Sequence, residues 1–216
     1  MSKRPGAVAP LSLAVVAIFE LAGGAQQLVD RILARVGGQI ITLSDVRAAE
    51  WLGLAGEATD PTVDQVTEAL VERELMRQEA SRLVFSEPVP AVVDARLGAI
   101  RSRFASEAEF QHELARVALT EPRLRAWLRD DVIVEEYIEQ RFTAAARPTS
   151  TEVETYYREH REELAAAGLP GPLDRIRTEV TGIVQRERRA ALVQDWIARL
   201  RDRIPVVRIS EGKGEG

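Results

Sequence analysis

The chain has 216 residues, of which 45% are hydrophobic, 29% are charged and only 5% are aromatic, and its formal net charge is −5 at pH 7. This apolar content excludes general disorder, and the length predicts one domain with short extensions. The sequence contains no cysteine, which excludes disulfides, thiolate metal sites and cysteine nucleophiles. The acidic balance argues against nucleic-acid binding, whose usual signature is a basic face.

Residues 1–25 have the pattern of a secretory signal peptide. Lys3 and Arg4 form a positive start, residues 11–19 (LSLAVVAIF) form an apolar run, and the small residues 23–25 suit cleavage. The alternative is an uncleaved membrane anchor, although the apolar run is shorter than the ~20 residues that span a bilayer. A lipoprotein is excluded because no cysteine can carry the lipid. We expect an exported mature chain that begins near Gln26 and has no stable membrane span.

A β-hairpin and a short helix are predicted next. Residues 31–36 (RILARV) and 39–41 (QII) have the pattern of short strands, and Gly37-Gly38 suits the turn between them. In the run TLSD, the Thr42 hydroxyl is expected to cap a helix through Trp51 while Asp45 reaches back to the helix start. Gly53 and Gly56 should end this helix.

Six further helices are predicted, each from a cap or proline signal and an apolar stripe. Asp60-Pro61 starts the first, and Pro88 and Pro90 end it. The others are expected at about 91–104, after Ser106, at about 122–142, after Thr149, and over 173–203, with a joint at 144–148 and a Gly/Pro break at 168–172. Pro205 ends the last helix, and residues 206–209 (VVRI) predict a strand.

The predicted fold is therefore mostly α, with a small β-sheet made from an N-terminal hairpin and a C-terminal strand. An isolated hairpin is marginal in water, and the C-terminal strand is the available third strand. The expected organisation is a signal peptide at 1–25, one helical domain at 26–210 and a polar tail at 211–216. Within the domain, residues 26–143 form the N-terminal part and residues 149–210 the C-terminal helices and strand.

Catalytic or metal-binding chemistry is not indicated by the residues. His112 and His160 each lie among charged residues without further ligands at matched spacing. The acidic pairs Asp130-Asp131, Glu135-Glu136 and Glu162-Glu163 are flanked by arginines, which favours a solvated, salt-bridged face over acid–base catalysis. The basic run 185–189 (QRERR) suggests nucleic acid only weakly, because the chain is acidic overall. We expect no cofactor, no metal and no catalytic residue.

Several apolar residues fall at predicted helix ends and loops, next to Gly or Pro, where core packing is least efficient. They are either part of the core or part of an exposed peptide-binding surface, and the sequence leaves both interpretations open. These candidate peptide-binding residues are Trp51, Leu52, Leu54, Phe85, Val89 and Val92.

Four segments resemble the SurA-type periplasmic chaperones. Residues 28–48 (LVDRILARVGGQIITLSDVRA) are similar to the hairpin and first helix with which that family opens. Residues 70–83 (LVERELMRQEASRL) and 148–160 (PTSTEVETYYREH) look like two of its helices. Residues 189–209 resemble its C-terminal helix and strand. Together, and in this order, the segments cover most of residues 28–209.

One departure from the family pattern changes what the resemblance implies. That family usually has a parvulin-type prolyl isomerase domain between the "YY" helix and the long C-terminal helix. Here only about a dozen residues, 163–174, stand in that place, and a domain of roughly 90 residues cannot fit there. The paired histidines of a parvulin site are also missing. The resemblance therefore implies the helical peptide-binding module alone and no enzyme activity.

The function implied is that of an ATP-independent holdase in the periplasm. Its partners would be unfolded exported polypeptides, outer-membrane proteins among them, held by apolar burial in a helical groove and by strand edges. The alternative is a dedicated structural or assembly partner of one exported protein. A prolyl isomerase is the least favoured interpretation.

Overall fold

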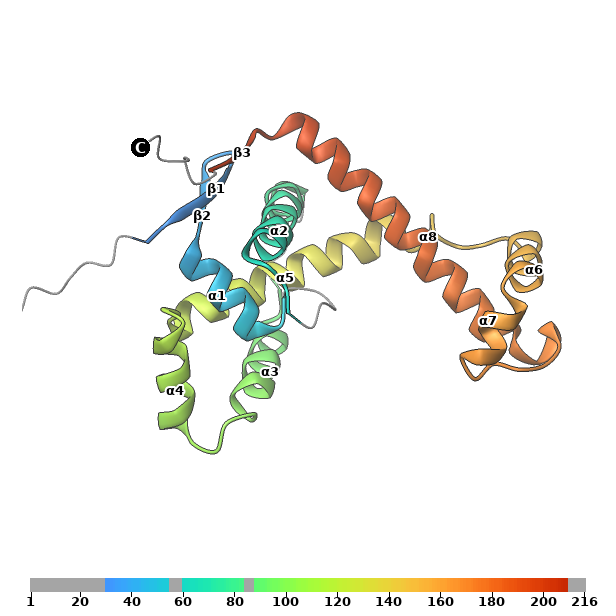
Figure 1. Cartoon of the computed structure of the whole chain (residues 1–216), viewed down its shortest axis with the longest axis horizontal. Helices are drawn as coiled ribbons and strands as arrows, with labels where there is room; N and C mark the ends of the chain where they lie inside the picture. The colour runs from blue at the N-terminus through green and yellow to red at the C-terminus, as the bar shows by residue number, and fades with distance from the viewer. Residues whose placement is uncertain (1–29, 55–59, 84–87, 210–216) are drawn as a thin grey trace, which may run out of the picture.

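The computed structural model describes residues 30–54, 60–83 and 88–209 (Figure 1). The predicted signal peptide at 1–25, the polar tail at 211–216 and Phe85 lie outside these residues. The described part is mostly helical with one small antiparallel sheet, which confirms the predicted fold class. Its elements are β1 (Ile32–Val36), β2 (Gln39–Thr42), α1 (Leu43–Leu52), α2 (Val63–Leu83), α3 (Pro90–Arg101), α4 (Glu107–Arg116), α5 (Glu121–Phe142), α6 (Ser150–Glu159), α7 (Arg161–Ala166), α8 (Leu173–Arg203) and β3 (Val206–Arg208).

The sheet joins the two ends of the described chain, as the sequence predicted. Its strand order is β2-β1-β3, and both pairings are antiparallel. The turn between β1 and β2 uses Gly37 at φ +56°, a conformation that favours glycine. The register between β1 and β2 shifts between Ile32 and Ala34, where β1 has a bulge. The bulge directs both Leu33 and Ala34 to the buried side and leaves Ile32 exposed.

Side-chain caps set several helix starts. Thr42 and Asp45 form a reciprocal capping box at α1, and Thr149 and Glu152 form another at α6. Gly53 ends α1 in the left-handed conformation, at φ +74°.

Two predicted helix boundaries differ from the structure. The sequence placed the start of α2 at Asp60-Pro61, but the helix begins at Val63. The cause is a reciprocal cap further along, in which Thr62 Oγ1 accepts from the Gln65 N–H at 3.2 Å and Gln65 Oε1 accepts from the Thr62 N–H at 2.8 Å. The helix α3 ends at Arg101, short of Phe104, and α7 was not predicted.

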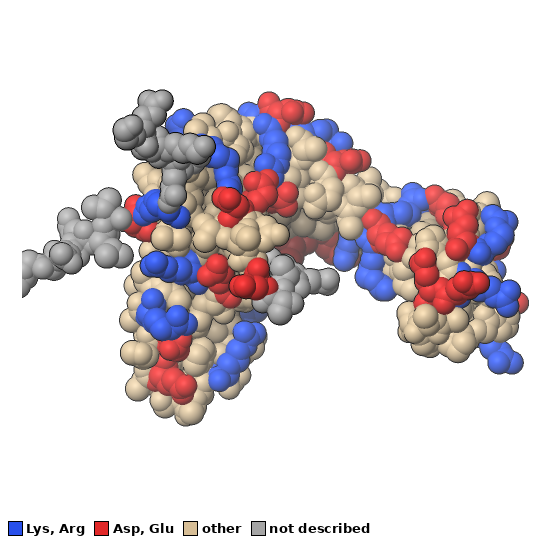
Figure 2. Space-filling view, viewed as in Figure 1, with Lys and Arg blue, Asp and Glu red and all other residues tan. Residues whose placement is uncertain are grey.

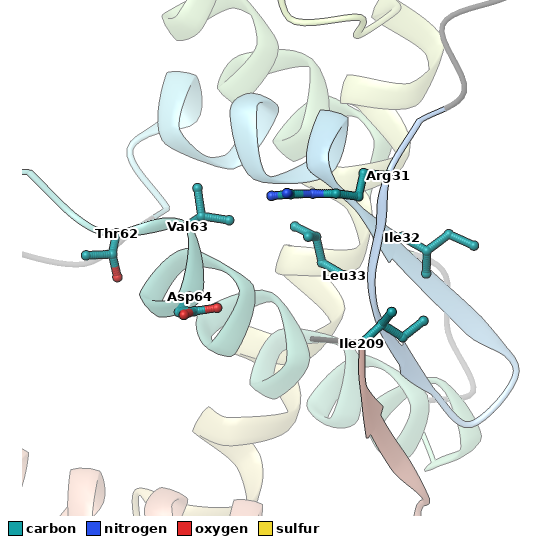
Figure 3. Close-up of a pocket in the computed structure, with 7 residues that line it drawn as sticks. All are labelled: Arg31, Ile32, Leu33, Thr62, Val63, Asp64 and Ile209. Atoms are coloured by element: carbon teal, nitrogen blue, oxygen red, sulfur yellow. The ribbon is translucent and has the colours of Figure 1, made fainter. Parts of the chain in front are cut away.

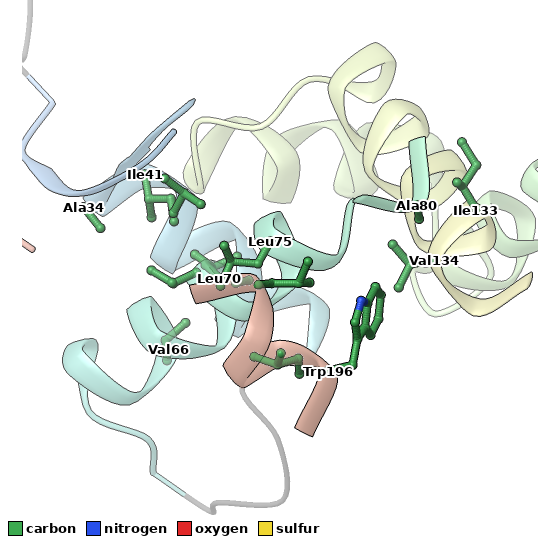
Figure 4. Close-up of a cluster of buried hydrophobic side chains, with 14 of the residues drawn as sticks. Ala34, Ile41, Val66, Leu70, Leu75, Ala80, Ile133, Val134 and Trp196 are labelled. Carbon is green, nitrogen blue, oxygen red and sulfur yellow. The ribbon is translucent and has the colours of Figure 1, made fainter. Parts of the chain in front are cut away.

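Three hydrophobic clusters organise the molecule. The first packs the inner face of the sheet against α1, α2, α5 and the C-terminal half of α8 (Figure 4), where Trp196 lies with its ring 5.0 Å from that of Tyr137. The second joins α1, α3, α4 and α5 around Phe110. The third holds α6 and α7 against the N-terminal half of α8, around Val180. We call the first two clusters the body and the third the distal lobe.

The body and the distal lobe are connected by α8 and by residues 143–149, and Figure 1 shows α8 running from one to the other. The apolar stripe of α8 serves the distal lobe up to Val184 and the body from Leu192 onward. Between them the helix is polar, and Arg188 pairs with Glu152 of α6 while Arg189 pairs with Glu139 of α5 at 3.0 Å. Among the described helices, none is both long and apolar enough to cross a membrane.

Candidate peptide-binding surface

Large aliphatic side chains that remain exposed occur in two places within the described residues. The first place, which we call the sheet patch, lies on the sheet and at the start of α2. The second, which we call the α2–α3 patch, lies at the end of α2 and the start of α3. The sheet patch comprises Ile32, Ile40, Val63, Val207 and Ile209, and the α2–α3 patch comprises Leu83, Val89 and Val92.

The sheet patch follows from the register of the three strands. Arg35 of β1 lies opposite Ile40 of β2 on one side and Val207 of β3 on the other. Since side chains alternate across a strand, these three residues share the outer face, while Val36 and Ala34 point into the core. The Arg35 side chain has no hydrogen bond or ion pair with any described residue. A single cation therefore stands among aliphatic side chains on the outer face.

A cleft lies at one end of the sheet patch. It has a volume of about 580 Å³ and is bounded by the beginning of β1, the end of β3 and the first turn of α2. In Figure 3 the Leu33 side chain points from β1 toward α2, and Ile209 stands at the end of β3. The lining is mixed, with aliphatic side chains and the polar groups of Arg31, Thr62 and Asp64.

The α2–α3 patch contains two of the residues that the sequence singled out. Val89 precedes α3 and is 63% exposed, and Val92 in its first turn is 41% exposed. Leu83 ends α2 on the other side of the connecting segment. Phe85, which the sequence also proposed, falls in residues 84–87, outside the described part. Val89 and Val92 therefore leave apolar side chains in contact with water at the start of α3.

The other predicted residues lie elsewhere and are half-buried. Trp51 and Leu52 pack on the cluster of α3 and α4, and the Trp51 ring stacks on Phe104 at a centroid distance of 5.8 Å. Leu54 packs instead on the sheet cluster. The structure thus brings Val89 and Val92 together on one surface and places Trp51, Leu52 and Leu54 against two different clusters.

Sequence reasoning named strand edges only in general terms as binding elements and singled out no strand residue as a binding residue. It placed Ile32, Ile40, Val207 and Ile209 in the predicted strands. A signal was present in the sequence, because ILARV and VVRI carry apolar residues at successive positions rather than at alternate ones. Such a strand is apolar on both faces. One of those faces here is not covered by any described residue.

Asp131, from one of the acidic pairs, and His160 have structural surroundings. Asp131 accepts from Arg73 Nε at 2.8 Å across the α2–α5 interface, and burial raises the pKa of this carboxyl despite the arginine. His160 stacks on Tyr156, whose hydroxyl donates to Glu187 at 2.7 Å. That bond and partial burial raise the pKa of Tyr156 to about 12. Within the described ranges, no group of three or more acidic or histidine side chains is placed to hold a metal ion.

Charged side chains cover much of the remaining surface. Figure 2 shows acidic and basic residues interspersed over both the body and the distal lobe. A second cleft, of about 440 Å³, lies between α5 and α8 and is lined by three glutamates, Ile138 and Arg189. Its polar lining contrasts with the aliphatic residues of the sheet patch. The apolar binding capacity of the described surface is therefore concentrated in the two patches.

No protein-family model matches this chain, and no curated protein matches it as a relative.

Proposed function

We propose that this protein is an ATP-independent chaperone that holds unfolded polypeptides after export, in the periplasm, with outer-membrane proteins among its clients. The observation that carries the proposal is the gathering of exposed large aliphatic residues into two patches on the body. Contiguous exposed apolar surface is typical of protein-interaction sites. The motifs similar to SurA-type chaperones, in a mostly helical fold of the kind that the resemblance implied, support the same function.

The mechanism proposed is reversible burial of the client's apolar side chains. Each buried aliphatic side chain contributes about 1.5–3 kcal/mol when it is fully removed from water. The exposed residues of the patches are already half-buried, so each contact contributes less. Micromolar affinity, about 8 kcal/mol, would therefore need several contacts at once. Weak contacts over a broad surface allow many clients to bind and to leave without nucleotide hydrolysis.

The test measures whether this protein, without nucleotide, suppresses the aggregation of two unrelated unfolded proteins. One of the two is an outer-membrane β-barrel. The double variant Val89→Ser, Val92→Ser should weaken suppression several-fold while the circular dichroism and Tm stay unchanged, because both residues are exposed. The matched control is Ala91→Ser, Ala95→Ser, which changes exposed small residues of the same helix. Suppression should persist in moderate salt, since screening weakens exposed ion pairs and not apolar contacts.

Two results would count against the proposal. If the wild-type protein suppresses neither substrate, the holdase function is wrong, and a dedicated partner of one exported protein becomes the better hypothesis. If the control variant weakens suppression as much as the valine variant, the α2–α3 patch is not the binding surface. Variants at Trp51 and Leu54 are less informative, because both residues also pack on the core.

A further inference from the structure

We propose that the outer edge of β3 binds an extended, mainly apolar client segment as a fourth strand of the sheet, and that a client carboxylate pairs with Arg35. This inference rests on the proposed chaperone function and names the kind of segment that the sheet patch recognises. It is carried by the hydrogen-bonding pattern of β3, by the aliphatic residues beside it and by the charge at their centre.

The backbone of β3 has an open hydrogen-bonding edge. The Gly37 N–H donates to Pro205 O at 2.8 Å, and the Ile209 N–H donates to Leu33 O at 2.9 Å. In an antiparallel pair such bonds occur at every second residue, so residues 205, 207 and 209 face β1. The backbone groups of Val206 and Arg208 consequently point away from β1. Within the described residues no other strand pairs with them.

Side chains leave this edge accessible and make it apolar. Arg208 is held toward α2 by ion pairs with Asp64 at 3.0 Å and Glu68 at 3.7 Å. Val207 and Ile209 are 43% and 48% exposed on the outer face. A client strand beside β3 would place its alternate side chains next to these two residues. The cleft beyond Ile209 would receive a further apolar side chain of the client.

Arg35 determines the charge of the segment that fits. It projects from the centre of the outer face, between Ile40 and Val207. A fourth strand would lie about 10 Å from β1, and the long arginine stem can lean over the small Val207 side chain toward it. The favoured partner is therefore an apolar segment that contains an aspartate or glutamate. A second copy of this chain is disfavoured as the fourth strand, because its own β3 (Val206–Arg208) carries no carboxylate to pair with Arg35.

The experiment measures binding of a labelled ten-residue peptide of alternating valine and threonine with one central aspartate, by fluorescence anisotropy. Arg35→Glu should weaken binding about three- to tenfold, the range expected for losing one exposed ion pair and gaining a repulsion. A peptide with arginine in place of aspartate should bind the Arg35→Glu variant more tightly than the wild type. Methylation of alternate backbone nitrogens on one side of the peptide should abolish binding, since those N–H groups are needed for strand addition.

The matched control is Arg103→Glu, at an exposed arginine between α3 and α4. Its affinity should equal that of the wild type. Neither variant should change the Tm, because neither side chain has an ion pair with a described residue. Equal binding of the methylated peptide, or equal affinity of the Arg35→Glu and Arg103→Glu variants, would overturn the inference.

Other occupants of the edge give distinct results. A wild-type dimer that dissociates in Arg35→Glu and binds no peptide would assign the edge to a second copy and overturn the inference. If a chain ending at Ile209 binds the peptide but the full chain does not, the edge belongs to residues 210–216. This result would also overturn the inference. Aggregation suppression by the same samples separates the two proposals. If suppression survives while these peptide results fail, only the strand-edge inference is wrong.

Discussion

Removal of β3 is expected to destabilise the whole body, because this strand covers one side of β1. A chain ending at Ile204 loses the Pro205–Gly37 and Ile209–Leu33 hydrogen bonds and the apolar contacts of the strand. Val207 and Ile209 are about half-buried, and Val206 packs on the sheet cluster. At about 1–1.5 kcal/mol for each half-buried side chain, the loss is roughly 3–5 kcal/mol.

This loss is large against the 5–15 kcal/mol that stabilises an ordinary domain. For a chain of this length it corresponds to a decrease in Tm of about 6–20 °C. The assay is thermal unfolding followed by circular dichroism. The control is a chain ending at Ile209, which keeps β3 and lacks only residues 210–216. Equal melting temperatures for the two truncated chains would refute the reasoning, because they would show that β3 contributes nothing to the sheet.

Other measurements test other parts of the structure. Trp196→Ala should cost about 3–5 kcal/mol, since the indole is buried against Tyr137 and Phe142, and a smaller loss would contradict that packing. Val180→Ala should reduce amide protection in α6–α8 but not in α2, because the distal lobe has its own cluster; uniform loss would indicate a single cooperative unit. The backbone N–H and hydroxyl of Thr149 lower the pKa of Glu152 from its usual 4.5, so its stabilising effect is present above that pH and is lost as the pH falls through the lowered value. Glu152→Gln should therefore lower the Tm at pH 6, and the plots of Tm against pH for the wild type and the variant should converge as the pH falls below about 4.5. Parallel plots would contradict this assignment. The purified protein should not accelerate prolyl isomerisation of a proline tetrapeptide, because residues 163–174 leave no room for a parvulin domain; a reproducible rate increase would contradict the similarity argument.

Local signals in the sequence were sufficient to predict most elements of the fold. The bounds of α8 follow from the Gly/Pro break before it and Pro205 after it, since neither residue type continues a helix. The capping boxes at Thr42 and Thr149 depend on side chains three residues apart and are therefore visible without tertiary information. The pairing of β3 with the hairpin was also predictable, because a lone hairpin lacks a stabilising partner.

The candidate surface depended on contacts between distant residues. The bulge in β1 places Ile32 outward and Leu33 inward, and strict alternation does not predict such a shift. Trp51 and Leu54 have sequence surroundings similar to those of Val89, but Phe104 and the sheet cluster partly cover them while Val89 stays exposed. Apolar residues look the same in a core and on a binding surface. The sequence by itself therefore determined most of the helices and caps and the sheet, and only the tertiary structure decided which apolar side chains remain in contact with water.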